Sequence, residues 1–198
     1  MNPPSSCSSF LLFTLTILLC SLHSCVCANN RLIKQTCKNC SKSDPNISYK
    51  FCITSFQSDR RSHWAKTLQE LGLLSIKLVR HNVTNTSAHI NELLKRKKGL
   101  DPFIEECLDD CLEVYSDSIS TLRGAIRDYK AMRYADSNVK LSSVLDASTT
   151  CEDGFKQKNG VVSPLTKRNK DTFQLSAIAL SIVNMLIDAD KLKGTLTF

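Results

Sequence analysis

The sequence predicts an all-α protein: an antiparallel up-down four-helix bundle with an N-terminal helical hairpin, stapled by disulfides. From His63 onward, apolar residues recur at spacings of three and four residues, which is the helical period. No alternating apolar and polar run of useful length indicates a β-strand. Six cysteines remain after a predicted signal segment, an even number that favours disulfides in an oxidising compartment.

Composition narrows the function classes. The chain has 198 residues with only 6 Gly and 5 Pro, which excludes collagen-like and low-complexity proteins. Its 26 Lys and Arg against 19 Asp and Glu give a formal net charge of +7. That excess is too small and too mixed in sign to indicate nucleic-acid binding, so no nucleic-acid partner is expected. It is compatible with an acidic partner.

The segment from Met1 to Ala28 is expected to be a secretory signal. It carries no Lys, Arg, Asp or Glu, and its apolar run from Phe10 to Leu22 is too short to span a bilayer. Small residues precede a cleavage point after Ala28, so removal of residues 1–28 would make Asn29 the mature N-terminus. No later segment reaches about 18 consecutive apolar residues, so no membrane association is expected once the signal is removed.

Residues 29–60 are predicted to form the helical hairpin. Asp44-Pro45 offers an N-cap followed by proline at the first helical position, so a short helix is expected from about Pro45 to Phe56. Cys37 and Cys52 flank this turn. A bridge between them would staple a hairpin too small to hold itself together, and loop entropy makes it worth roughly 3 kcal/mol.

Residues 61–198 are predicted to form the bundle. Its first helix is expected from Trp64 to Lys97, with Gly99 as its stop. Trp64 is expected to anchor the hairpin to the bundle. The stretch Asn82–Ser87 is poor in helix formers, which leaves a kink or fray open at that point.

The remaining three helices have clear boundaries and inner faces. Asp101-Pro102 begins the second, Asn159-Gly160 ends the third, and Ser163-Pro164 caps the fourth. Their inner positions are spaced by three or four residues, as in a bundle seam. These positions are Leu108, Cys111, Tyr115, Ile119, Leu122, Ile126 and Tyr129 in the second helix, Tyr134, Asn138, Leu141, Leu145, Ser148, Cys151 and Phe155 in the third, and Leu175, Ala179, Ile182, Leu186 and Ala189 in the fourth. Short connections make consecutive helices antiparallel neighbours.

Counting along the chain brings one pair of cysteines together. If the turn between the second and third helices lies near Ala131, Cys111 precedes that turn by the same number of positions by which Cys151 follows it. Both then lie at the same height on adjacent helices, and a Cys111–Cys151 bridge is predicted. Cys40 and Cys107 are expected at opposite ends of the bundle. Free thiols, or a bond between chains, are therefore favoured over a bridge between these two.

No constellation of catalytic residues is present, so no enzyme activity, cofactor or metal site is expected. The spacing Cys37-x-x-Cys40 suits redox or zinc chemistry, but the βαβ context and the further ligands are missing. His81 and His89 lie about two helical turns apart, too far along a helix to share one metal ion. Acidic pairs such as Glu105-Glu106 fall on polar helix positions, where a solvated surface is a better interpretation than a glycosidase pair.

The corner between the second and third bundle helices has an unusual composition. Lys130, Met132, Arg133 and Tyr134 place two bases, a methionine and an aromatic ring in one tight turn, where bundles usually carry small polar residues. This is the composition of a hot spot for a protein partner. The alternative, in which Tyr129 and Tyr134 close the end of the core, stays open.

Four N-x-S/T sequons support secretion, at Asn39, Asn46, Asn82 and Asn85. Glycan is expected mainly at Asn46 and at one of Asn82 or Asn85, which are too close together for both. Asn39 is expected to be a poor site because neighbouring cysteines crowd it.

Five motifs resemble the plant invertase and pectin methylesterase inhibitor domain, and the likeness covers essentially Leu32 to Ile187. They are Thr36-Cys37, Tyr49-Lys50-Phe51-Cys52, Cys111-Leu112-Glu113-Val114-Tyr115, Thr150-Cys151-Glu152-Asp153-Gly154-Phe155 and Ser163-Pro164-Leu165-Thr166. Within the family, the chain is most similar to the invertase inhibitors of the plane-pollen-allergen type. The resemblance implies the bridges Cys37–Cys52 and Cys111–Cys151 and a protein without enzymatic activity.

The resemblance also implies a function. Family members bind an apoplastic or vacuolar acid invertase, or a pectin methylesterase, and block the active-site cleft. Invertase inhibitors carry a Pro-Lys-Phe corner, which corresponds here to Met132-Arg133-Tyr134, with base and aromatic kept in kind and the proline lost. The sequence thus predicts a secreted inhibitor of a plant acid invertase. The alternatives are a pectin methylesterase inhibitor and, disfavoured by the tight seam, a non-inhibitory helical binding or signalling bundle.

Overall fold

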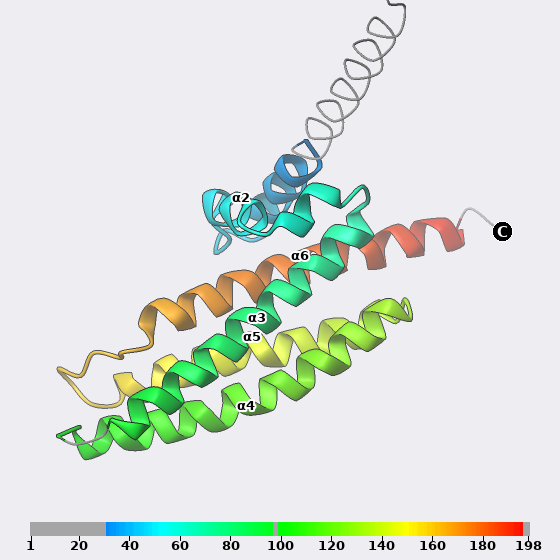
Figure 1. The fold of residues 1–198 in the computed structure, drawn as a ribbon. Helices are drawn as coiled ribbons and strands as arrows, with labels where there is room; N and C mark the ends of the chain where they lie inside the picture. Colours follow the sequence, from blue (N-terminus) through cyan, green and yellow to red (C-terminus); the bar gives the residue numbers. More distant parts are fainter. Residues whose placement is uncertain (1–30, 97–98, 196–198) are drawn as a thin grey trace, which may run out of the picture.

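The structure, a computed structural model, describes residues 31–96 and 99–195. The expected signal, residues 1–28, lies outside these ranges. Every regular element within the described ranges is a helix, and they contain no β-strand. Four long helices form the body of the molecule (Figure 1): α3 (Leu68–Lys95), α4 (Pro102–Lys130), α5 (Tyr134–Lys156) and α6 (Thr166–Thr195).

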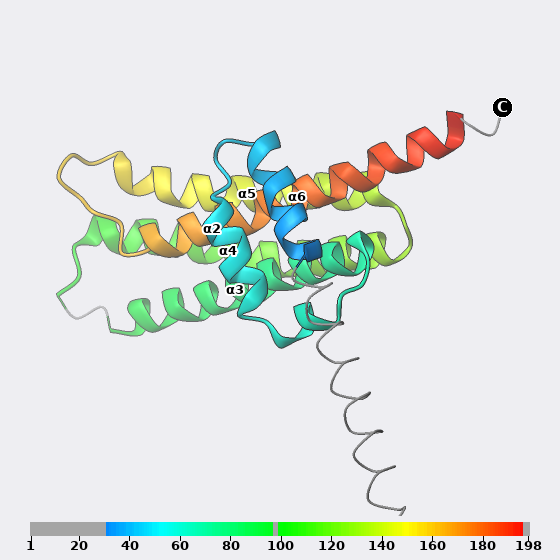
Figure 2. The ribbon, with the colours of Figure 1, turned by 90° about the horizontal axis from the view of Figure 1, so that it is seen from above.

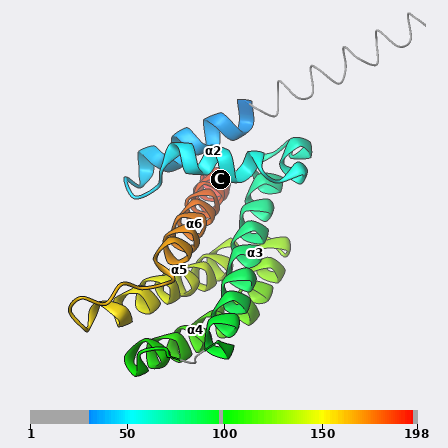
Figure 3. The same cartoon turned by 60° about the vertical axis from the view of Figure 1, so that its left-hand side comes forward.

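The four long helices form an up-and-down bundle. Each packs against the next along the chain, α3 on α4, α4 on α5 and α5 on α6, and α6 returns to pack against α3. Figures 1 and 3 show the same helices running side by side from two directions. The predicted all-α, antiparallel four-helix bundle is confirmed.

The hairpin lies on one side of this bundle. It consists of a helix over residues 31–43 and of α2 (Tyr49–Gln57), joined by the Cys37–Cys52 bridge with a Cα–Cα distance of 5.6 Å. It crosses α6 on the side away from α4 (Figures 2 and 3). Gln174 of α6 holds it there, because its Nε2 donates to the backbone oxygen of Asn46 at 2.5 Å.

The second hairpin helix begins later than the sequence predicted. The expected start at Pro45 is wrong, because Ser48 is the N-cap of α2 and its Oγ accepts from the backbone N–H of Phe51 at 3.3 Å. Asp44 instead closes a turn, since its Oδ1 accepts from the N–H of Asn46 at 2.8 Å. Asp-Pro favours a turn as well as a helix start, and here the turn prevails.

A capping box starts α3. Thr67 Oγ1 accepts from the N–H of Glu70 at 3.1 Å, and the Glu70 carboxylate accepts from the N–H of Thr67 at 3.3 Å. The preceding residues form a short 3-10 helix, η1 (Arg60–Trp64), so the predicted helix start at Trp64 is wrong. Trp64 is 67% exposed, which also corrects the expectation that it anchors the hairpin. Phe56, 1% exposed, is the buried aromatic of this region.

α3 runs as one continuous helix through Asn82–Ser87, a stretch where the sequence alone allows a kink or fray. Tertiary contacts explain this, because Val83 is fully buried and Asn82 Oδ1 accepts from Thr172 Oγ1 of α6 at 2.6 Å. Weak local propensity is overridden by packing. Beyond the helix end, Gly99 takes the left-handed conformation that favours glycine, with φ of 87°.

The Cys111–Cys151 bridge joins α4 to α5, with a Cα–Cα distance of 5.0 Å. This is the pair that counting from the corner predicted. Cys40 and Cys107 are free and buried, which was one of the alternatives that the sequence left open. Burial raises the pKa of both thiols, so both are poor nucleophiles at neutral pH.

A polar cluster ties α4, α5 and α6 together inside the bundle. The Tyr115 hydroxyl donates to Asn169 Oδ1 at 2.7 Å, and Asn169 Nδ2 donates to Glu152 Oε2 at 2.7 Å. Burial raises the pKa of Tyr115 to about 12. Because each of these bonds joins two different helices, the cluster helps to set the heights of the helices relative to one another.

α6 carries the longest apolar stretch among the described helices. Its stretch Thr166–Leu192 is long and apolar enough to cross a membrane by length and composition, but 56% of its most apolar window is buried inside the bundle. This is the pattern of a core helix. Its start is fixed by Ser163, whose Oγ accepts from the N–H of Leu165 at 3.1 Å.

Candidate functional site

The corner between α4 and α5 closes α4 with a Schellman motif. The N–H of Met132 donates to the carbonyl of Tyr129 at 3.0 Å, and the N–H of Arg133 donates to the carbonyl of Asp128 at 2.9 Å. These bonds satisfy carbonyls that a helix end otherwise leaves unpaired. The corner is therefore a hydrogen-bonded turn with a defined backbone rather than a loose loop.

Met132 occupies the left-handed position of this motif, with φ of 59°. Glycine usually holds that position, because a side chain costs about 1–2 kcal/mol there. The Met132 side chain is 75% exposed, so core packing does not compensate for the strain. Strain kept at an exposed apolar residue makes Met132 a candidate for contact with a partner.

Arg133 is held by acidic residues on two sides. Its Nη2 contacts Oδ1 of Asp128, and its Nε lies 3.3 Å from Oδ2 of Asp136. Asp128 is 4% exposed and also pairs with Nζ of Lys140 at 2.8 Å. Hydrogen bonds from Lys140 and Arg133 lower the pKa of Asp128. The guanidinium is thus fixed in position, while 52% of the Arg133 side chain stays exposed.

Tyr129 and Tyr134 close the end of the core beneath the corner. Their ring centroids are 5.1 Å apart in an edge-on arrangement, and the residues are 4% and 8% exposed. The Tyr129 hydroxyl donates to the backbone carbonyl of Gln69 in α3 at 2.8 Å. Gly72 makes this approach possible, because a Cβ there would overlap the hydroxyl. Tyr129 is therefore a core residue, as the alternative interpretation of the corner predicted. Tyr134 exposes little surface to a partner.

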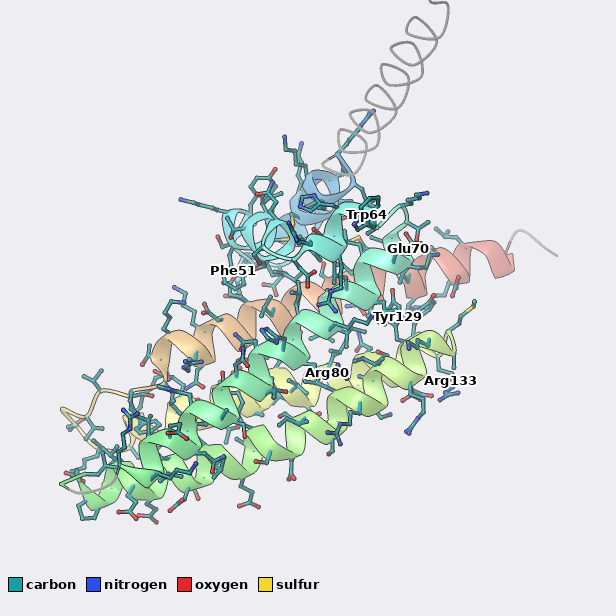
Figure 4. All side chains as sticks on the ribbon, in the orientation of Figure 1. Phe51, Trp64, Glu70, Arg80, Tyr129 and Arg133 are labelled. Carbon is teal, nitrogen blue, oxygen red and sulfur yellow. A yellow bond between two sulfur atoms is a disulfide. The ribbon has the colours of Figure 1, made fainter. Side chains whose placement is uncertain are left out.

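A hollow of about 530 Å³ lies between this corner and α6. Met132, Arg133 and Tyr134 line it on the corner side, and Ile187 lines it on the α6 side. Lys130, the last residue of α4, is exposed next to the turn. Figure 4 shows Arg133 pointing away from the bundle at this end, with Tyr129 between it and α3.

Sequence reasoning missed the residues that hold the corner in place. Asp128 and Arg133 are paired across a turn, one position beyond the i, i+4 rule for helical ion pairs, so that rule gives no signal for them. Gly72 lies on another helix, and no local pattern links it to Tyr129. The Schellman motif was also hidden, since its usual marker is a glycine at the position that Met132 holds.

The four sequons differ in accessibility. Asn39, Asn46 and Asn85 are exposed. Asn82 is half-buried, and its side-chain oxygen is engaged with Thr172. Within residues 31–96 and 99–195, no group of three His, Cys, Asp or Glu side chains gathers that could hold a metal ion.

A family model described as plant invertase/pectin methylesterase inhibitor matches residues 31–182, which include the hairpin, both bridges and the corner. The chain belongs to the plant invertase/pectin methylesterase inhibitor family. Proteins of this family inhibit one of those two classes of enzyme, so the family consists of inhibitors.

Relatives within the family carry the names of inhibitors of both enzyme classes, invertases and pectin methylesterases. A "Putative invertase inhibitor" of Platanus acerifolia is 44% identical over 155 residues, which is 78% of this chain and 85% of the relative. "Pectinesterase inhibitor 12" of Arabidopsis thaliana is 35% identical over 155 residues, covering 78% and 87%. The fold also matches a crystal structure of a mutant pectin methylesterase inhibitor from Arabidopsis, with a TM-score of 0.62 and 24% identity over 73% of this chain and 96% of that one.

Proposed function

We propose that this inhibitor is secreted and blocks the active-site cleft of a plant acid invertase as a stoichiometric complex. One observation carries the proposal: a hydrogen-bonded corner presents Met132 and Arg133 outward at the end of a rigid bundle. A turn that is already ordered loses little conformational entropy on binding. The Platanus relative supports the choice of invertase as the target.

The chemistry of the target suits these side chains. A retaining glycosidase carries two carboxylates in its cleft. The Arg133 guanidinium can pair with a carboxylate through two parallel hydrogen bonds, which are strongest where water is excluded. Met132 adds apolar contact beside that pair, and Lys130 adds positive charge that attracts an acidic cleft. Tyr134 supports the corner from beneath through its ring contact with Tyr129.

The compartment also fits the corner. We place the protein in the cell-wall space or the vacuole, with residues 1–28 as the signal that directs it there. Both compartments are acidic. The lowered pKa of Asp128 keeps its carboxylate charged under such conditions, so the ion pairs that position Arg133 persist.

A pectin methylesterase is the second candidate target. The Arabidopsis pectinesterase inhibitor at 35% identity favours it. An inhibitor of that enzyme would use helix faces more than the corner. Replacing Arg133 should therefore affect inhibition of the two enzymes differently, and activity assays distinguish the two candidate targets.

The test is a parallel titration of both enzymes with the purified chain lacking residues 1–28. We expect acid invertase activity to fall linearly to near zero at one equivalent, while pectin methylesterase stays active. The protein alone should cleave neither sucrose nor pectin. Inhibition of pectin methylesterase alone would establish the second candidate, and inhibition of neither enzyme would leave a non-inhibitory helical bundle.

A further inference from the structure

The indole of Trp64 is the largest exposed apolar side chain in the described part of the chain, and the proposed inhibitory corner does not use it. It is the only tryptophan of the chain, and it is 67% exposed at the end of η1, between the hairpin and α3. Figure 4 shows it beside the start of α3, near Glu70. The hollow at the corner and the hollow at Trp64 have no lining residue in common.

Trp64 borders an open hollow of about 240 Å³. The other lining residues are Arg61, Ala65, Glu70, Leu73, Leu74 and Lys77. This volume is below the roughly 300–1,000 Å³ of a typical small-molecule pocket. It suits one or two units of an extended chain that lies across the surface.

Basic residues outnumber acidic ones around this hollow, since residues 59–77 carry four Lys or Arg against two Asp or Glu. Both oxygens of Asp59 accept from the Arg61 guanidinium, at 2.5–3.1 Å. Glu70 Oε2 accepts from the backbone N–H groups of Lys66 and Thr67 at the start of α3. Lys77 makes no ion pair within the described part of the chain, and a ligand can reach its ammonium from the hollow.

We propose that this Trp64 surface binds an anionic polysaccharide built of uronic acid units. The apolar face of one sugar ring would pack on the indole, whose negative π-face attracts C–H groups. Carboxylates of that ring and the next would reach Lys77 and Arg61. Arg61 is held by Asp59 with 59% of its side chain exposed, so it is positioned before the ligand arrives.

A polysaccharide explains this surface better than a protein partner. A stable protein interface buries about 800 Å² on each side around an apolar centre. Here one indole stands among charged groups, with Leu73 only half-buried beneath it and Leu74 buried. A polymer needs only a weak site of this kind, because it offers many identical units in a row.

The single tryptophan makes the test direct, since all indole emission of the protein comes from Trp64. The chain lacking residues 1–28 is titrated with oligogalacturonate of about ten units, so that many identical units compete for the single hollow. We expect a saturable change in emission. Fully methyl-esterified oligomers of the same length, which lack the charge, should bind at least about tenfold more weakly.

Variants separate stacking from charge. Co-sedimentation with insoluble pectate should be lost in Trp64→Ala and weakened about tenfold in Lys77→Gln. Lys170→Gln, which removes an exposed lysine at a different hollow on α6, should behave as wild type. Melting temperatures check that each variant is folded, and Trp64→Ala should melt as wild type because the indole is exposed.

Three results would overturn the proposal. They are unchanged emission at saturating oligogalacturonate, equal binding of the esterified oligomer, and pectate binding by Trp64→Ala equal to that of wild type. If Trp64→Ala instead weakens invertase inhibition while pectate has no effect, the surface belongs to a protein interface and the polysaccharide proposal is wrong. Invertase inhibition by wild type is measured separately, so failure here leaves the proposed function standing.

Discussion

Replacing Met132 with glycine should stabilise the folded protein and weaken its inhibition of acid invertase. In the folded state, glycine removes about 1–2 kcal/mol of left-handed strain at a φ of 59°. Glycine also makes the unfolded chain more flexible, which costs about 0.5–1 kcal/mol. The net gain is about 0.5–1 kcal/mol of unfolding free energy. In a chain of this size, that raises the melting temperature by about 1–4 °C.

The same change should weaken the complex. Full burial of a methionine side chain contributes about 1.5–3 kcal/mol. Because Met132 is 75% exposed in the free protein, most of that amount is available on binding, about 1–2 kcal/mol. The inhibition constant for acid invertase should therefore rise about 5- to 30-fold.

Two controls separate strain from contact. Met132→Ala keeps the strained backbone and removes most of the side chain, so it should inhibit as weakly as the glycine variant without the gain in melting temperature. Met132→Leu should inhibit nearly as well as wild type. A glycine variant that melts lower than wild type would refute the strain argument. One that inhibits as strongly as wild type would remove Met132 from the interface.

Three further predictions concern the fold, its modification and its pH dependence. Cys111→Ser opens a bridge that spans 40 residues and should lower the unfolding free energy by about 4 kcal/mol. Cys37→Ser opens a bridge that spans 15 residues and should lower it by about 3 kcal/mol. Chemical denaturation measures both values, and the reverse order would contradict the loop-entropy account. Glycopeptide mass spectrometry of the secreted protein should find glycan on exposed Asn85 and none on Asn82, which is engaged with α6; glycan on Asn82 would be incompatible with this packing. Because the pKa of Asp128 is lower in the folded state, its contribution to stability is present above about pH 4 and is lost as pH falls further. In Asp128→Asn, the melting temperature should therefore fall less steeply with pH below that value than in wild type. An equal slope in both proteins would contradict a stabilising role of the Asp128 ion pairs.

Much of the bundle could be predicted from the sequence, because its main signals are local or periodic. Asp101 caps α4 as predicted, with Oδ1 accepting from the N–H of Phe103 at 2.8 Å. The Cys111–Cys151 pair followed from a constant rise per residue on two antiparallel helices. Inner faces were right to within one position: Val144 of α5 is buried where Leu145 was expected, because helices turn slightly to fit their neighbours.

The remaining features depend on residues far apart in the chain. α2 starts at Tyr49 rather than Pro45. The backbone N–H of its N-cap, Ser48, donates to Oε1 of Gln174 in α6 at 2.9 Å, a contact that no local pattern predicts. Trp64 is exposed because the 3-10 helix that carries it ends before α3, which neither composition nor period predicts.

The composition of the corner could likewise be interpreted from the sequence, whereas its geometry could not. Its residues stand out in the sequence, and we predicted a partner surface from them. Its rigidity comes from Asp128 and from the hydrogen bond of Tyr129 to α3, which are visible only once the helices are packed. The burial of Tyr134 likewise follows from packing, since its ring contacts Tyr129.

In the proposed complex, the guanidinium of Arg133 pairs with an acidic group of acid invertase. The most direct test is the inhibition constant of Arg133→Gln, measured beside Arg133→Lys and Arg123→Gln. Glutamine removes the charge without placing a new carboxylate against Asp128, which keeps Lys140 as its partner. Arg123 is an exposed arginine of α4, outside the corner, and serves as the matched control.

We predict that Arg133→Gln weakens inhibition at least about 30-fold, as expected when one partner of a desolvated charge pair is lost. Arg133→Lys should weaken it less, because the charge survives while the fork of donors is lost. Arg123→Gln should inhibit as wild type. Equal inhibition by wild type and Arg133→Gln, with both proteins folded, would contradict the assignment of the corner as the group that blocks the enzyme.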